Sequence, residues 1–341
     1  MIVGAWLVLW TLTQPNGPPS TPPVNRSGAT PSAASKATLK DMVDAARTEG
    51  ELQVSWSGPL DEAVRQNFEA GFNRQFGFRL TLRIAPVAPT ASGGKPPWDL
   101  LLGSQTHSAE LARTGLLSSH DWSRLFGAPV QAALFDGGAL AFAHQIVQPA
   151  YNAKRVPAGA APTAWEVLLE AKWRGRLGVS SAVDVWADLS SSWGDDRASQ
   201  FVQGLAAQQP VRGTPDDLEQ KLEDGAIDIL AAVDDRLLRR ARERAAAVAP
   251  IEVHPLLLQA LVASPLREAA HPNAAALFAG FLVTEEGQQL WQQYAGESSI
   301  FSAGSAYQKR LEGKQYVLAG ADFSLREQPA RASKYARLLG Y

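Results

Sequence analysis

The chain of 341 residues contains no cysteine and only two methionines. The absence of cysteine excludes disulfide bonds, thiolate metal sites, a cysteine nucleophile and a lipid attached to an N-terminal cysteine. Charge is also sparse: 19% of the residues are charged, the formal net charge is −2, and no block of like charge dominates. The chain therefore lacks the basic character that binding to nucleic acid or to an anionic membrane requires.

The apolar stretch at residues 1–12 is too short to cross a bilayer, which needs about 20 residues. It has the length of the apolar region of an export signal, but no lysine or arginine precedes it and no clear cleavage site follows. We expect an export signal here; the alternative is a non-specific apolar tail. Residues 13–37 are rich in Pro, Ser and Thr, which predicts an extended linker.

With 45% hydrophobic residues, a chain of this length can bury two substantial cores. Short apolar runs at 51–56, 98–103 and 227–233 predict strands, and each is followed by a helical pattern. In an open α/β sheet, ligands bind beyond the carboxyl ends of the strands, beside the unpaired N–H groups of the next helix. These corners are therefore where we expect binding residues.

Four such corners supply candidate ligand-binding residues. They are Ser57 and Gly58 after the first strand, Ser104 and Gln105 after the second, Ser180, Ser181 and Trp186 after a strand at 177–180, and Asp234 and Asp235 after the last. Hydroxyl groups suit an oxyanion, whereas carboxylates beside an indole suit an organic cation. These residues also have purely structural interpretations. The small residues can form ordinary turns between a strand and a helix. The residues after 180 can cap a helix predicted at 197–207, and Trp186 can be a buried core residue.

The most specific pattern lies between residues 138 and 181. An apolar run at 138–152 predicts one long strand, and residues 162–176 predict a helix with a capping box of Thr163 and Glu166. The ordered motifs Tyr-Asn, Val-Pro, Pro-Thr-x-Trp-Glu-x-Leu-Leu and Lys-Trp-x-Gly-Arg resemble the extracellular solute-binding proteins of ABC importers. The resemblance is to the ferric-iron-type group, which includes binders of polyamines, phosphonates and thiamine. Segments 41–51, 98–102, 271–278 and 286–288 fit the same family in order.

This resemblance implies an α/β, two-lobed periplasmic-binding-protein-like fold of type II, with two mixed sheets flanked by helices and joined by hinge strands. It places residues 38–142 and 256–310 in the first lobe and residues 143–255 and 311–341 in the second. The hinge strands are expected near 142–145 and 256–260. A small molecule would be held between the lobes, which close around it.

The resemblance also implies an extracytoplasmic, monomeric protein that delivers a solute to the membrane subunits of an ABC importer, without a cofactor. In iron-binding members, adjacent tyrosines near the position of Asp234 and Asp235 hold the metal. This chain has no tyrosine between Tyr151 and Tyr294, so we assign no metal ligand and rank ferric ion behind an organic cation and an oxyanion.

Two other functions stay open at this stage. One is a diverged binding module that acts as a sensor or scaffold near the membrane, and the other is an enzyme on the same scaffold. The sequence contains no nucleophile elbow, no zinc-binding His-Glu-x-x-His motif and no phosphate-binding loop, so we assign no catalytic residue. His107 and His271 each stand beside a predicted helix start and are expected to be structural.

Overall fold

The computed structural model describes residues 38–56, 62–86, 97–128, 133–134, 137–319 and 327–341. The export-signal and linker predictions, and the candidates Ser57 and Gly58, lie outside the described residues. None of the helices within the described ranges is both long and apolar enough to cross a membrane.

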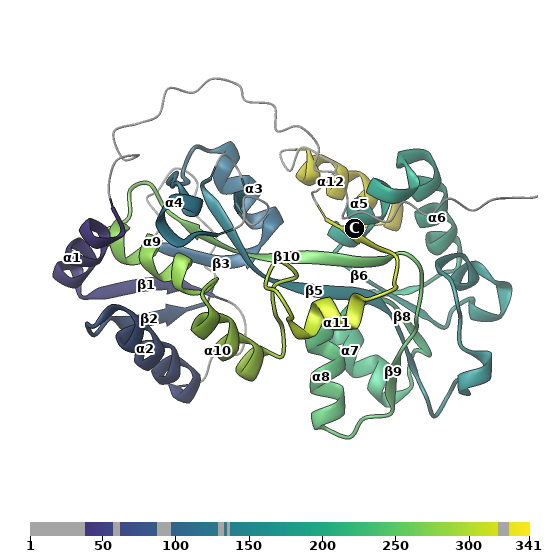
Figure 1. Cartoon of the computed structure of the whole chain (residues 1–341). Helices are drawn as coiled ribbons and strands as arrows, with labels where there is room; N and C mark the ends of the chain where they lie inside the picture. The colour runs from purple at the N-terminus through teal and green to yellow at the C-terminus, as the bar shows by residue number, and fades with distance from the viewer. Residues whose placement is uncertain (1–37, 57–61, 87–96, 129–132, 135–136, 320–326) are drawn as a thin grey trace, which may run out of the picture. The chain divides into compact units, whose positions relative to one another are not determined.

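Helices and strands alternate along the chain (Figure 1). The helices are α1 (Leu39–Glu49), α2 (Glu62–Phe76), α3 (Gln105–Arg113), α4 (Trp122–Phe126), α5 (Asp184–Trp193), α6 (Asp195–Ala207), α7 (Pro215–Asp224), α8 (Asp235–Glu243), α9 (Pro272–Phe281), α10 (Glu285–Ala295), α11 (Ala306–Leu311) and α12 (Gln328–Leu339). The strands are β1 (Glu51–Ser55), β2 (Thr81–Ala85), β3 (Leu100–Ser104), β4 (Ala133–Leu134), β5 (Ala139–Asn152), β6 (Leu177–Ser180), β7 (Val211–Gly213), β8 (Ile229–Asp234), β9 (Val248–Pro250), β10 (Leu256–Pro265) and β11 (Tyr316–Leu318).

Two long strands join two groups of parallel strands. The order of hydrogen-bonded strands is β2-β1-β3-β10-β5-β8-β6-β7, with β4 and β9 paired to β5 and β11 paired to β10. Strand β10 is antiparallel to β3, β5 is antiparallel to β8, and the two long strands are antiparallel to each other. The two mixed sheets that we expected are thus continuous through β5 and β10, which cross the middle of the view in Figure 1.

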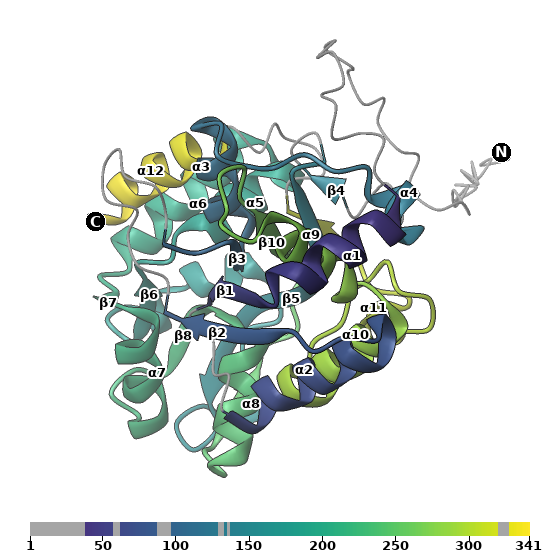
Figure 2. The same cartoon turned by 90° about the vertical axis from the view of Figure 1, so that its left-hand side faces the viewer.

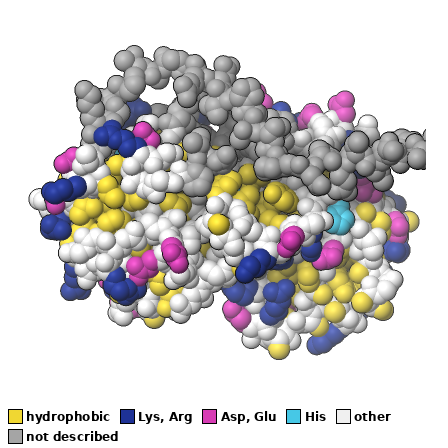
Figure 3. Space-filling view, in the orientation of Figure 1, with side chains coloured by type: hydrophobic (Ala, Val, Ile, Leu, Met, Phe, Trp, Pro, Cys, Tyr) yellow, Lys and Arg dark blue, Asp and Glu magenta, His cyan; other side chains and the backbone are white. Residues whose placement is uncertain are grey.

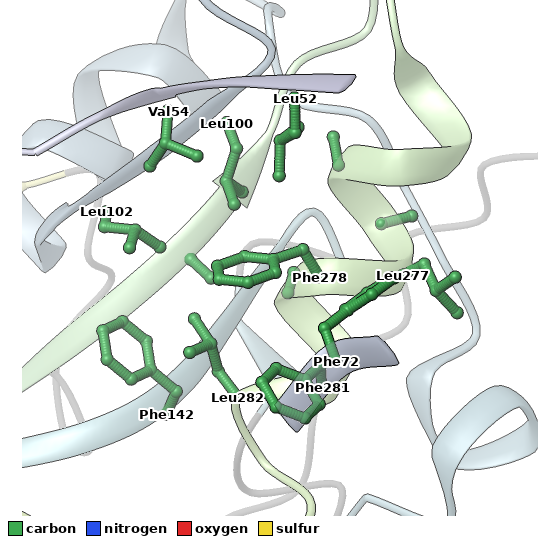
Figure 4. Packing of buried hydrophobic residues seen from close by; sticks show 14 of the residues in the cluster. Leu52, Val54, Phe72, Leu100, Leu102, Phe142, Leu277, Phe278, Phe281 and Leu282 are labelled. Carbon is green, nitrogen blue, oxygen red and sulfur yellow. The ribbon is translucent and has the colours of Figure 1, made fainter. Parts of the chain in front are cut away.

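Separate hydrophobic cores lie at the two ends of this sheet. The first core lies between β1, β3, α1, α2, α9 and α10, and Figure 4 shows Phe72, Phe278 and Phe281 at its centre. Figure 2 views this end of the molecule, with α1 and α2 toward the reader. The second core lies between β6, α5, α6 and α12, and a third, smaller core joins α7, α8 and β8. Burial of each large side chain contributes about 1.5–3 kcal/mol, so each core stabilises its own end of the sheet.

Local sequence signals explain several helix ends. Thr38 accepts a hydrogen bond from the backbone of Asp41 to begin α1, and Gly50 ends the helix in a left-handed conformation. Thr214 caps α7 in the same way, with Gly225 at its end. These helix boundaries confirm the sequence-based predictions for residues 38–50 and 214–225.

One sequence-based expectation is wrong. Residues 162–176 form two short 3₁₀ helices, η4 (Trp165–Leu169) and η5 (Ala171–Trp173), and Thr163 makes no capping bond. Trp165 and Leu168 are three residues apart, which matches the 3₁₀ period, and both are buried. The helix predicted at 197–207 is present as α6, which begins at Asp195 and directly follows α5 (Asp184–Trp193).

Candidate functional site

A pair of glutamines lies where the two long strands cross from one core to the other. Gln145 of β5 and Gln259 of β10 are directly opposed in the antiparallel register, so their side chains share one face of the sheet. Nε2 of Gln145 donates to the carboxylate of Glu297 at 2.6 Å. Nε2 of Gln259 donates to the carboxylate of Asp188 at 2.6 Å. Each amide is therefore bonded to a buried acid.

The same face of the long strands is apolar on both sides of this glutamine pair. On one side, Ala143 and Leu261 belong to the first core, and on the other, Val147 and Leu257 belong to the second. Neither core can extend across buried amides and carboxylates without a loss of hydrogen bonds. The glutamine pair therefore marks the boundary between two lobes.

A hydrogen bond joins the amino ends of α3 and α5 across this boundary. Oγ1 of Thr106 donates to the carboxylate of Asp184 at 2.9 Å. Burial raises the pKa of Asp184, against the opposing effects of the Thr106 hydrogen bond and of His107. Because Asp184 begins α5, its carboxylate also lies at the positive end of the helix dipole.

The Thr106–Asp184 bond brings together two of the predicted corners. Ser104 caps α3, and the Oγ atom of Ser180 accepts a hydrogen bond from the backbone of Ala182 at 3.0 Å, just before α5. Ser181 is exposed beside it. Gln105 is 3% exposed, and its Nε2 atom has no hydrogen-bond partner in the structure. Donors and acceptors thus gather between the two helix starts.

Trp186 faces the interior of the second core rather than solvent. It is 1% exposed, and its ring centroid lies 6.2 Å from that of Trp165 and 5.9 Å from that of Phe201. The ring holds α5 in place against η4 and α6.

The two aspartates at the end of β8 have different surroundings. Asp234 caps α8 through the backbone N–H of Leu237 at 3.0 Å and pairs with Arg236 at 2.9 Å. Asp235 accepts hydrogen bonds from three donors. They are the backbone N–H of Ile146 at 2.9 Å, the hydroxyl of Tyr307, and the guanidinium of Arg310 at 2.9 Å. Asp234 thus caps α8, and Asp235 is held by structural partners from β5 and α11.

Glu297 belongs to this region and was missed by sequence reasoning. It is 1% exposed, and burial raises the pKa of its carboxyl group to about 7. Nε1 of Trp291 donates to it at 3.2 Å, and Arg236 lies 3.9 Å away. The usable signal was in its partner Gln145, a polar residue inside an apolar strand pattern.

The described part of the chain offers no metal site of the expected kinds. No three His, Asp or Glu side chains among the described residues are arranged to hold a metal ion. Burial and the neighbouring Asp235 raise the pKa of Tyr307, so its phenol stays protonated and donates to that carboxylate. Burial also raises the pKa of Tyr335 and of Tyr341. In this structure the phenol of Tyr307 is therefore engaged as a donor to Asp235.

Elsewhere, a hollow of about 430 Å³ lies beside α11, between Ile300 and Tyr316. Among the described residues, none of the sequence-predicted binding residues lines it. On the face shown in Figure 3, acidic and basic side chains of the described residues are interspersed.

Comparison with protein-family models and with curated proteins gives no match. Solved structures do match. Iron-bound HitA from Pseudomonas aeruginosa is 21% identical with a TM-score of 0.67, over 85% of this chain and 99% of HitA. Trichodesmium FutA with iron and citrate is 16% identical with a TM-score of 0.68, over 86% and 100%. An ABC transporter substrate-binding protein from Bradyrhizobium japonicum USDA 110 is 16% identical with a TM-score of 0.68, over 85% and 99%.

These similarities show the fold. The chain has the two-lobed α/β fold of the type II periplasmic binding proteins, as the sequence resemblance implied.

Proposed function

We propose that this chain is an extracytoplasmic solute-binding protein that captures a small molecule between two lobes and delivers it to an ABC importer. The observation that carries the proposal is the fold, which over 85% of the chain matches a substrate-binding protein of an ABC transporter. The buried polar boundary at Gln145 and Gln259 supports it. The proposal assigns no catalytic residue and expects a monomer.

In this proposal the first lobe comprises residues 38–142 and 256–310, and the second comprises residues 143–255 and 311–341. The lobes rotate about β5 and β10 near the glutamine pair, and the Thr106–Asp184 bond forms as they close. Closure removes the solute from water, which strengthens its polar contacts. The solute would lie between the corners at Ser57 and Gly58, Ser104 and Gln105, Ser180 and Ser181, and Asp234. Trp186 would support the site by fixing α5, and Asp235 by anchoring α8.

We propose an organic cation, such as a polyamine or a thiamine-like molecule, as the solute. Burial raises the pKa of Asp184, whose carboxylate accepts a hydrogen bond from Thr106 between the corners at Ser104 and Ser180, so the folded protein stabilises its charged form less than water does. A bound cation would restore that stabilisation. An oxyanion held by the serines is less well supported beside this carboxylate.

Ferric ion is the second candidate, because the matching structures of HitA and FutA contain iron. Carboxylates are suitable hard donors for such an ion. Iron binding here would need a different ligand set from paired phenolates, since Tyr307 is engaged with Asp235.

Native mass spectrometry of the unrefolded protein, followed by calorimetric titration with polyamines, thiamine, phosphonates and ferric citrate, tests the proposal. We expect a retained organic mass and a titration with an organic cation. X-ray scattering of the same samples should show compaction on binding. Retained iron would favour the second candidate, and the absence of compaction with every solute would overturn the closing mechanism.

A further inference from the structure

Helix α8 lies against the carboxyl end of α10, although the two helices belong to different cores. Trp291 of α10 is part of the first core, and Leu237 of α8 is part of the third. Gly296 caps the end of α10 with a φ of +69°, and a Cβ atom there would lie 2.8 Å from a guanidinium nitrogen of Arg239. In Figure 1 both helices lie below β5 and β10.

The charges on the two sides of this contact are complementary. The carboxyl end of a helix carries about half a negative charge, which favours a neighbouring cation. Arg239 supplies that cation and pairs with Glu243 on its own helix at 3.7 Å. Arg236, one turn earlier, lies 3.9 Å from Glu297. Two arginines of α8 thus face the consecutive residues Gly296 and Glu297.

Strand β5 is bonded to both sides of this contact at three consecutive residues. The donor–acceptor pairs are the backbone N–H of His144 with the carbonyl of Ser298 (3.2 Å), Nε2 of Gln145 with Glu297 (2.6 Å), and the backbone N–H of Ile146 with the carboxylate of Asp235 (2.9 Å). Since β5 passes from one core toward the other at these residues, a rotation of the lobes about it would change the distance between α8 and the end of α10.

The α8 contact and the Thr106–Asp184 bond lie on opposite sides of the crossing strands. Strand β3, which leads into α3, pairs with β10, whereas β8, which leads into α8, pairs with β5. Two contacts on opposite sides restrain rotation more than one contact would.

We propose that Arg236, which lies beside Glu297, and Arg239, which lies beside Gly296, form a latch between the two lobes. The latch holds the lobes closed for part of the time when no solute is bound. The inference rests on the proposed two-lobe binding function. A pre-closed population raises the apparent affinity, because less of the binding free energy is spent on closure.

The absence of cysteine from the chain allows site-specific labelling to test the latch. Ala70→Cys on α2 and Gln200→Cys on α6 place labels on exposed positions of the two lobes, away from α8. The distance between the labels is measured in the full chain without solute. We expect Arg236→Gln with Arg239→Gln to lower the ratio of closed to open molecules by about two- to fivefold for each arginine.

Arg242→Gln is the control, because it removes one positive charge from an exposed position of the same helix and so matches each single substitution of the double variant. Distances that are equal in the double variant and in this control would overturn the latch. Circular dichroism checks that the double variant folds; if it does not, Arg239→Gln alone decides, with a change in distance supporting the latch and no change overturning it.

The two proposals fail separately. If solute causes compaction but the label distance without solute is the same in all variants, the binding function is retained and the latch is overturned. Changed distances without binding of any solute would remove the binding function but retain the latch as a contact between lobes.

Discussion

Glu297 couples stability to pH at the scale of one residue. Burial raises the pKa of this carboxyl group from 4.5 to about 7. The folded protein then binds more protons than the unfolded chain between these values, so the free energy of unfolding falls as the pH rises from 4.5 to 7. Above pH 7 the penalty is on the order of 3 kcal/mol.

Glu297→Gln removes this titration and keeps an acceptor for Gln145. We expect the variant to gain stability relative to the parent protein as the pH rises through this range, measured by thermal unfolding at a series of pH values. Glu243→Gln, at a side chain that is mostly exposed, should leave the pH dependence unchanged. If thermal stability changed with pH in the same way in the parent protein and in Glu297→Gln, the assignment of this pH dependence to Glu297 would be contradicted.

Asp99 is a second buried acid whose partners are all structural. It is 2% exposed and accepts hydrogen bonds from four donors. They are the backbone N–H groups of Gln53 (2.9 Å), Ala270 (2.8 Å) and His271 (3.1 Å), and Nδ1 of His271 (2.7 Å). Asp99→Asn puts an amide N–H where an acceptor is needed, and should lower the free energy of unfolding by about 2–3 kcal/mol. Chemical denaturation measures this; the same change at the more exposed Asp44 should cost much less.

At the scale of elements, sequence reasoning succeeded where a local signal decides the structure. The caps of α1 and α7 depend on a hydroxyl, a turn of helix and a glycine, all within one short segment. It failed at residues 162–176, because the helical spacing of Trp165 and Leu168 is also compatible with 3₁₀ turns. Burial in the second core and the bond from Trp165 to the carbonyl of Pro255 (3.0 Å) depend on tertiary contacts.

The first turn of α10 contains a position, Gly287, that accepts only glycine for steric reasons. A Cβ atom on Gly287 would lie 2.1 Å from the carbonyl oxygen of Phe281 and 2.9 Å from Cα of Leu282. Both are backbone atoms, which cannot move aside as a side chain can. Gly287→Ala should therefore cost about 1–3 kcal/mol, despite the better helix propensity of alanine. Gly159→Ala, with nothing within 4 Å, is the control and should be near neutral in the same denaturation assay.

At the scale of the whole molecule, the lobe boundary could not be predicted in detail. The apolar runs at β5 and β10 pointed to crossing strands, and the polar corner at Ser104 was correctly predicted to lie at a helix start. After Ser180 the predicted helix was 197–207, and α5 was missed. The pairing of Gln145 with Gln259 depends on the register between strands far apart in sequence. Their bonds to Glu297 and Asp188 depend on how segments of both lobes pack against these two strands.

Closure should weaken when the bond between α3 and α5 is removed. Thr106→Val keeps the size of the side chain and removes the donor to Asp184, a loss of about 0.5–1.5 kcal/mol. We expect a two- to tenfold weaker solute affinity and a less compact average in X-ray scattering. Thr114→Val, at the other end of α3, removes a hydroxyl that bonds only within the helix region. Equal affinity in both variants would show that the bond does not restrain closure.

The first core combines segments from both ends of the chain, and this determines when the protein can fold during synthesis. This core joins Leu52 and Phe72, made early, to Phe278 and Trp291, made late. A growing chain cannot complete it until α9 and α10 have emerged, and such non-local contacts form slowly. Until α9 and α10 have emerged, the apolar side chains of β1 and α2 therefore lack part of the core that buries them in the folded protein. A circular permutant that places α9 and α10 ahead of α1 would allow this end of the molecule to fold before the rest is made.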